Sequence, residues 1–154
     1  MTSSLVVSEM CIIYSYKIPR QDLLGKKLLS INEKYYVVDH GLREAVYGHN
    51  ARDIDQILEN IVCLELLRRG YTVTIGKTGN FEVDFIAEKG NRKCYVQVTY
   101  LLASPETIER EFRVYKDIKD NYPKYVVSMD ELDFSQDGIQ HYNIRKFLRL
   151  PRDY

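Results

Sequence analysis

Two acidic side chains alternate with apolar ones in the segment FEVDFIA, residues 81–87, and their spacing suits metal chemistry. Successive side chains of a strand point to opposite faces, so Glu82 and Asp84 should share the face that Val83 and Phe85 avoid. Carboxylate oxygens are the ligands that Mg²⁺ prefers. A bound Mg²⁺ orients water and offsets the charge that builds on a phosphate, so the pattern points to hydrolysis of a phosphodiester.

The strand that follows should bring partners to these carboxylates. If residues 89–92 form a four-residue turn, Asp84 lies directly across from Gln97. In the same register, Glu82 lies across from Thr99. A slip by one residue would turn every side chain to the wrong face, which favours this register.

A helical glutamate, Glu59, could reach the same edge of the sheet from the preceding helix. The expected site therefore contains four side chains: Glu59, Asp84, Gln97 and Thr99. Asp84 and Glu59 are the expected ligands of Mg²⁺, and no other cofactor is expected. Gln97 offers only a neutral carbonyl oxygen, and Thr99 cannot replace the lysine ammonium that usually stabilises charge in such a reaction.

The same residues also have a purely structural interpretation. Alternation is the ordinary pattern of a half-exposed strand, so Glu82 and Asp84 could simply form its solvated face. Gln97 would then be a cross-strand hydrogen-bond partner, and Glu59 an exposed helix position. The residues alone leave both interpretations open.

The elements that position these residues follow from periodicity. A broad apolar stripe from Ile54 to Leu67 predicts a helix, which Arg68, Arg69 and Gly70 should end. Other expected elements are strands at 4–18, 27–39, 71–77, 80–88, 92–101 and 124–128, and helices at 41–47, from Ser104 (N-cap) onward, and at 143–150. The first two strands could pair as a hairpin. The central order is helix, strand, strand, strand, helix, strand, which predicts a single α/β domain.

Composition limits the class of protein. The chain has 154 residues, and its 22 Lys and Arg residues balance 22 Asp and Glu residues, which weighs mildly against extensive DNA binding. Cys11, Cys63 and Cys94 have no metal-ligand spacing, so we expect apolar packing in a reducing compartment. No apolar run reaches the roughly 18 residues that a membrane span needs. We expect a cytoplasmic protein without membrane contact.

One motif that could suggest nucleotide binding is rejected. Residues 76–78, Gly-Lys-Thr, look like the end of a phosphate-binding P-loop. The upstream glycine, Gly70, is one residue too far away and ends a helix, whereas the loop should connect a strand to a helix. No ATP hydrolysis is expected from this chain.

Three segments together resemble a known family: ENIVCLELLRRGYTVTIGK (59–77), EVDFIAEKGNRKCYVQVTYLL (82–102) and EREFRVYKDIKDNYPKYVVSMDEL (109–132). They are similar to the uncharacterised C-terminal domain that follows the P-loop module in many prokaryotic AAA-type ATPases. YYVVDHGLR (35–43) resembles the segment that joins that domain to a winged-helix-like region. The resemblance covers nearly the whole chain.

The resemblance implies a PD-(D/E)XK, restriction-endonuclease-like αβββαβ core with an N-terminal β-hairpin extension. Asp84 takes the place of the motif aspartate, and Glu59 matches the helical glutamate of many active relatives. Residues 97–99, Gln-Val-Thr, stand where an active member carries acid-x-Lys. Lys77 or Lys93 could substitute for the missing lysine from a neighbouring strand.

The resemblance also implies a division into residues 1–45, a hairpin and linker left from a winged-helix-like region, and residues 46–154, the nuclease-like domain. The ATPase module is not in the sequence, so we expect a C-terminal remnant, a separately encoded piece or a fragment of such an ATPase.

We expect a degenerate, noncatalytic nuclease-like accessory domain of an AAA-type ATPase that contacts nucleic acid or a partner protein. One alternative is an active Mg²⁺-dependent nuclease with a migrated lysine. The other is a pure protein-interaction or homo-oligomerisation domain, in which the hairpin at residues 4–39 offers an exposed edge.

Overall fold

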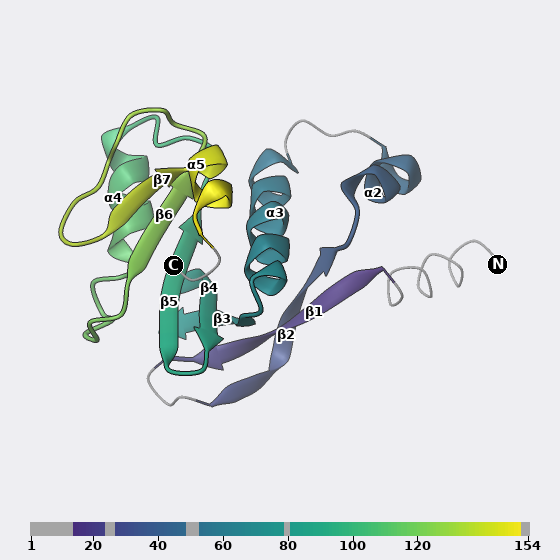
Figure 1. Cartoon of the computed structure of the whole chain (residues 1–154), viewed down its shortest axis with the longest axis horizontal. Helices are drawn as coiled ribbons and strands as arrows, with labels where there is room; N and C mark the ends of the chain where they lie inside the picture. The colour runs from purple at the N-terminus through teal and green to yellow at the C-terminus, as the bar shows by residue number, and fades with distance from the viewer. Residues whose placement is uncertain (1–13, 24–26, 49–52, 79–80, 152–154) are drawn as a thin grey trace.

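The computed structural model describes residues 14–23, 27–48, 53–78 and 81–151. Its elements are β1 (Ser15–Asp22), β2 (Leu28–Val37), α2 (His40–Tyr47), α3 (Ile54–Arg68), β3 (Thr72–Thr78), β4 (Phe81–Lys89), β5 (Arg92–Val98), α4 (Pro105–Arg113), β6 (Lys124–Ser128), β7 (Gln140–Asn143) and α5 (Ile144–Arg149). The chain is therefore a mixed α/β protein, as its sequence predicts (Figure 1).

Within the described residues, the strands form one seven-stranded sheet in the order β2-β1-β3-β4-β5-β6-β7. β1 and β2 pair antiparallel, which confirms the expected hairpin; its expected residues 4–13 lie outside the described part. β1 also pairs in parallel with β3, so the hairpin is continuous with the central sheet. β3, β4 and β5 form an antiparallel meander, and β6 and β7 follow in parallel with β5.

Helices cover both faces of the sheet (Figure 1). On one face, α3 and α5 pack against the strands through an apolar cluster that includes Val62 and Phe147. On the other face, α4 and the segment after it pack through a second cluster that includes Phe112 and Tyr115. The two clusters place the sheet between two helical layers, the arrangement that buries both of its apolar faces.

The ends of the two long helices follow the expected chemistry. Gly70 has φ of 83°, and the Tyr71 N–H donates to the Leu66 carbonyl at 3.1 Å, so a glycine in the left-handed region ends α3. The Thr107 N–H donates to Ser104 Oγ at 3.2 Å, which confirms the N-cap of α4. The short strand β7 was not expected, and β5 ends at Val98 rather than at residue 101.

β4 contains a β-bulge that its alternating sequence does not reveal. The register of the β3–β4 ladder shifts between Thr74 and Gly76, so two residues of β4 lie opposite one residue of β3. Those two residues are Asp84 and Phe85. Beyond the bulge the faces exchange: Phe85 packs in the cluster under α3, whereas Val83 packs in the cluster under α4. The expectation that Val83 and Phe85 share a face is therefore wrong.

Candidate functional site

The expected pairing of β4 with β5 is confirmed, but the regular backbone ladder between the two strands ends before Asp84. The ladder runs regularly from Lys89 opposite Arg92 to Phe85 opposite Val96. At Asp84, hydrogen bonds between side chains and backbone N–H groups join the two strands instead. The Asp84 N–H donates to Gln97 Oε1 at 3.2 Å, and the Val98 N–H donates to Asp84 Oδ2 at 2.8 Å. Asp84 and Gln97 thus lie across from each other, as the four-residue turn predicts.

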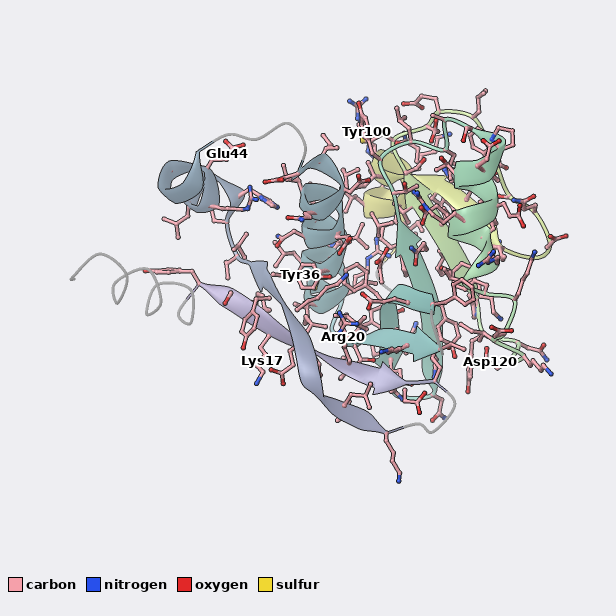
Figure 2. The ribbon with its side chains drawn as sticks, turned by 180° about the vertical axis from the view of Figure 1, so that it is seen from behind. Lys17, Arg20, Tyr36, Glu44, Tyr100 and Asp120 are labelled. Atoms are coloured by element: carbon pink, nitrogen blue, oxygen red, sulfur yellow. The ribbon has the colours of Figure 1, made fainter. Side chains whose placement is uncertain are left out.

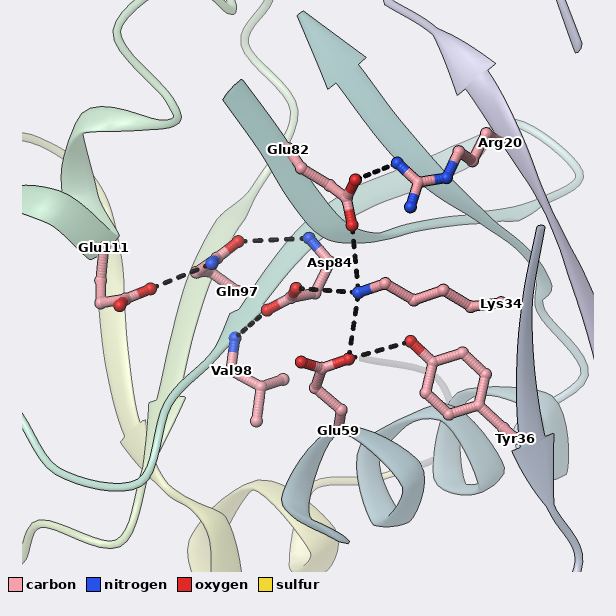
Figure 3. Close-up of polar contacts among 9 residues, drawn as sticks. All are labelled: Arg20, Lys34, Tyr36, Glu59, Glu82, Asp84, Gln97, Val98 and Glu111. Carbon is pink, nitrogen blue, oxygen red and sulfur yellow. Dashed lines mark hydrogen bonds and ion pairs between the residues drawn. The ribbon is translucent and has the colours of Figure 1, made fainter. Parts of the chain in front are cut away.

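Three carboxylates from two elements surround one lysine, Lys34 of β2 (Figure 3). The Lys34 Nζ atom lies 3.2 Å from Glu59 Oε2 on α3 and 3.0 Å from Glu82 Oε1 on β4. It lies 3.9 Å from Asp84 Oδ1 at the bulge. We call Lys34, Glu59, Glu82 and Asp84 the carboxylate–lysine cluster. The bulge makes it possible because it keeps Glu82 and Asp84 on the side of the sheet that faces α3.

The hairpin supplies two further contacts to this cluster. The Tyr36 hydroxyl donates to Glu59 Oε2 at 3.1 Å, and its ring packs 5.4 Å from the Phe85 ring, measured between centroids. The Arg20 guanidinium forms an ion pair with Glu82. Every cation near the three carboxylates in these contacts comes from β1 or β2.

The electrostatics of the cluster favour a charged lysine. Burial acts to lower the pKa of Lys34, but the charges of Glu59, Asp84 and Glu82 outweigh it and raise that pKa. The pKa of Asp84 is raised well above its ordinary value, first by its burial and then by the nearby charge of Glu59. Asp84 is 7% exposed. Its carboxylate is therefore a costly charge in the folded protein, which the Lys34 ammonium and the Val98 N–H partly offset.

The other two expected site residues lie apart from this cluster. Gln97 Nε2 donates to Glu111 Oε2 at 3.0 Å, and Glu111 is a buried residue of α4, on the opposite side of the sheet. Thr99 is also buried, and its N–H donates to the Val127 carbonyl as part of the β5–β6 pairing. The structure thus unites Glu59 with Asp84, while Gln97 turns toward α4.

Neither lysine suggested from the sequence takes the position of Lys34. Lys93 Nζ forms an ion pair with Glu88 at 3.1 Å and lies 5.2 Å from the centre of the Tyr95 ring, near the far end of β4. Lys77 is exposed on β3. Lys34 had no local signal in the sequence, since it precedes Asp84 by 50 residues and sits in a strand of mixed composition.

The cluster does not fit Mg²⁺ in this arrangement. Mg²⁺ needs oxygen ligands at about 2 Å in a near-octahedral shell. Lys34 lies between the carboxylates that would have to converge, and the Gln97 oxygen already accepts the Asp84 N–H. Within the described residues, no group of three or more His, Cys, Asp or Glu side chains is arranged to hold a metal ion. The ammonium of Lys34 supplies the positive charge instead.

A cavity opens beside the cluster. It measures about 300 Å³ and lies where β2, α2 and α3 meet, with Lys34, Tyr36 and Glu59 in its wall. Arg43 of α2 also lines it and forms a 2.5 Å ion pair with Asp53. The cavity gives small solutes a route to Glu59 and Lys34.

A buried serine–histidine pair elsewhere resembles a nucleophile and its base, but its hydrogen bonds run the wrong way. The Phe134 N–H donates to His141 Nδ1 at 3.3 Å, so the ring proton is on Nε2. That proton is donated to Ser128 Oγ at 2.9 Å, and the Ser128 hydroxyl donates to Asp130 Oδ2 at 2.8 Å. His141 therefore cannot take the serine proton, and the pair anchors the loop at residues 129–139.

Comparisons with known proteins give little more. No protein-family profile matches the sequence. An uncharacterized protein of Haemophilus influenzae is 40% identical over 126 residues, which are 81% of this chain and 31% of that protein. The chain thus spans about a third of the length of that relative. Among the described residues, none of the helices has the length and apolar content to cross a membrane.

Proposed function

We propose that this chain is a noncatalytic PD-(D/E)XK-like module, an accessory domain of a longer AAA-type ATPase, that contacts nucleic acid or a partner protein without cutting. The observation that carries this proposal is the Lys34 ammonium between the Glu59, Glu82 and Asp84 carboxylates. A cation fixed to the chain stands where a nuclease would need a divalent metal and its water.

The topology supports the nuclease-like part of the proposal. The succession α3-β3-β4-β5-α4-β6 agrees with an αβββαβ core. Within it, three antiparallel strands are followed by a fourth that is parallel to the third. Asp84 lies on the second of these strands and Glu59 on the first helix, as the resemblance to the ATPase-associated domains implies.

The relative from Haemophilus influenzae supports the accessory part. The matched region is 31% of that protein, so a domain of this kind can stand beside other domains in one chain. The replacement at Gln97 also agrees with an accessory role, because its oxygen accepts from the Asp84 N–H and its amide nitrogen donates to Glu111, so both ends of the side chain serve the fold.

The first test measures divalent metal binding with and without the lysine. Wild-type protein should bind no Mn²⁺ in the millimolar range, as read by electron paramagnetic resonance. Lys34→Met should create a Mn²⁺ site, because it removes the ammonium from between three carboxylates, one of which, Glu59, lines the cavity. The matched control is Lys17→Met, which removes a hairpin lysine paired with Glu33 outside the cluster.

Equal Mn²⁺ binding by wild type and Lys34→Met would refute the idea that Lys34 replaces a metal. A second assay addresses the alternative of an active nuclease with a migrated lysine, for which Lys34 is the cation nearest the carboxylates. Wild-type protein should leave plasmid and single-stranded DNA intact with Mg²⁺ or Mn²⁺. Cutting that both Lys34→Met and Asp84→Asn abolish would establish Lys34 as a migrated active-site lysine and overturn the noncatalytic proposal.

A further inference from the structure

The opposite end of the sheet carries a second surface of distinct chemistry. The β4–β5 turn at residues 89–92 lies five residues along β4 from Asp84, or about 16 Å at the rise of a strand. The segment 120–124 lies beside this turn, since the Tyr95 N–H donates to the Pro123 carbonyl. Figure 2 shows Asp120 far from Glu44 and Tyr36, across the molecule from α2.

Two adjoining hollows mark this surface. Their volumes are about 380 Å³ and 230 Å³, and both are lined by Asn91, Arg92, Lys93 and Tyr122. Tyr71 also forms part of the wall of the smaller hollow, which is therefore lined by Tyr71 as well as Tyr122. A ridge made by the shared residues therefore separates a polar hollow from a tyrosine-lined one.

The exposed ring of Tyr122 is held in place by a cation. Tyr122 is 43% exposed. Lys93 Nζ lies 5.8 Å from the centre of the Tyr122 ring and 5.2 Å from that of Tyr95. Tyr95 is fixed in turn, because its hydroxyl donates to Asp120 Oδ2 at 2.5 Å. A ring fixed in this way offers an open face at little entropic cost.

Positive charge exceeds negative charge around this ring. Three cations lie there, which are Arg92, Lys93 and Lys124, with two carboxylates, which are Glu88 and Asp120. Arg92 is exposed at the turn itself. The zero net charge of the chain therefore conceals a local excess of positive charge at this end of the sheet.

We propose that the surface formed by Arg92, Lys93 and Tyr122 binds single-stranded nucleic acid. A base stacks on the exposed part of the Tyr122 ring, and the adjoining phosphates lie near Arg92 and Lys93. This combination of aromatic faces with cations is how proteins hold single strands without reading their sequence. An acidic peptide would use the cations but would leave the tyrosine face unused. The inference goes beyond the proposed function because it does not involve the carboxylate–lysine cluster.

Fluorescence anisotropy of a labelled oligothymidine of about 12 nucleotides tests it, since sites of this kind span about 4–16 nucleotides. Wild-type protein should bind, and its affinity should fall steeply between about 50 and 200 mM salt. Tyr122→Ala and Arg92→Glu should each weaken binding about tenfold, the loss expected for one stacked base or a reversed phosphate contact. Tyr35→Ala and Lys116→Glu, which make the same changes at exposed positions elsewhere, should stay within about twofold of wild type.

Two outcomes would overturn the proposal. One is that wild-type protein does not bind the oligothymidine, or that the control variants weaken its binding as much as Tyr122→Ala and Arg92→Glu do. The other is tighter binding of an oligoglutamate of the same length, insensitive to Tyr122→Ala, which would assign the surface to an acidic protein segment. Thermal unfolding of each variant verifies that it is folded. Lys34→Met should bind the oligothymidine like wild type, so failure here is distinguishable from failure in the metal assay.

Discussion

At the scale of single residues, the carboxylate–lysine cluster is a balance of half-buried charges around the buried Asp84. Three carboxylates meet two cations, Lys34 and Arg20, and the Tyr36 hydroxyl donates to the same Glu59 oxygen that Lys34 contacts. Removing one partner from such a group leaves an unpaired buried charge, which is far more costly than the pair is stabilising. The same reasoning explains why Gln97 cannot be changed to an acid without consequence.

Gln97→Glu should destabilise the protein rather than restore a nuclease motif. The new carboxylate would face the buried Glu111, to which Gln97 Nε2 now donates at 3.0 Å. We expect a loss of about 2–4 kcal/mol in the free energy of unfolding near neutral pH, as for other uncompensated buried charges. Urea unfolding measures this loss.

Glu111→Gln in the Gln97→Glu background should recover much of that stability, because it restores an amide donor opposite the new acid. A double mutant no more stable than Gln97→Glu alone would show that the two side chains do not interact as described. Plasmid cutting should stay absent in both variants, since Lys34 is unchanged.

The sequence could predict part of this site. Asp84 and Gln97 were placed across from each other because the turn at residues 89–92 has a readable length, and Glu59 followed from helical spacing. Lys34 could not be found in that way. The contact of Lys34 with the carboxylates depends on the parallel pairing of β1 with β3, which no local sequence pattern predicts.

At the scale of elements, the bulge in β4 is the feature that positions the cluster. Helix α3 and the strands of the meander were predictable because apolar periodicity, Gly70 and the glycine turns mark them. The bulge has no such marker, and the alternation across Val83 and Phe85 suggests a regular strand. β7 was missed because four residues joined directly to a helix give too short a pattern to recognise.

Gly76 of β3 lies at the register shift and should not tolerate a side chain. A β-carbon there would lie 3.1 Å from two side-chain carbons of Ile86 and 3.2 Å from Leu23 Cδ1. Gly76→Ala should therefore lower the free energy of unfolding by about 1–3 kcal/mol through overpacking. Thermal unfolding provides the measurement.

Ile86→Val is the matched compensation, because it removes Cδ1, one of the two Ile86 carbons that the new methyl group would meet. Alone it should cost about 1 kcal/mol. In the Gly76→Ala protein, Ile86→Val should lower the free energy of unfolding by less than this, or even raise it. Strictly additive losses would mean that Gly76 and Ile86 do not share the space inferred from the structure.

At the scale of the whole molecule, the hairpin completes both the sheet and the core. Ile18 and Tyr36 are 3% and 5% exposed and belong to the apolar cluster under α3. The hairpin also brings Lys34 and Arg20 to the carboxylates. The N-terminal residues thus contribute to packing and to charge balance at the same time.

A fragment of residues 46–154 should fail to fold as a stable unit. Removing the first 45 residues deletes Ile18 and Tyr36 from the core and leaves the carboxylates without Lys34. Circular dichroism should show no cooperative thermal transition, and the fragment should bind the dye ANS. A cooperative transition within a few degrees of the full chain would instead establish residues 46–154 as an independent domain.

The parallel pairing of β1 with β3 also sets an order of events while the chain folds. Arg20 pairs with Ile75, so the 54 residues between them must be made and arranged before that contact can close. The hairpin, a local structure, can form within microseconds, whereas the distant contact carries the entropy of a long loop. On the ribosome, the edge of β1 that pairs with β3 therefore stays unpaired until β3 has emerged. The ammonium of Lys34 reaches its carboxylates only when β1 and β3 pair.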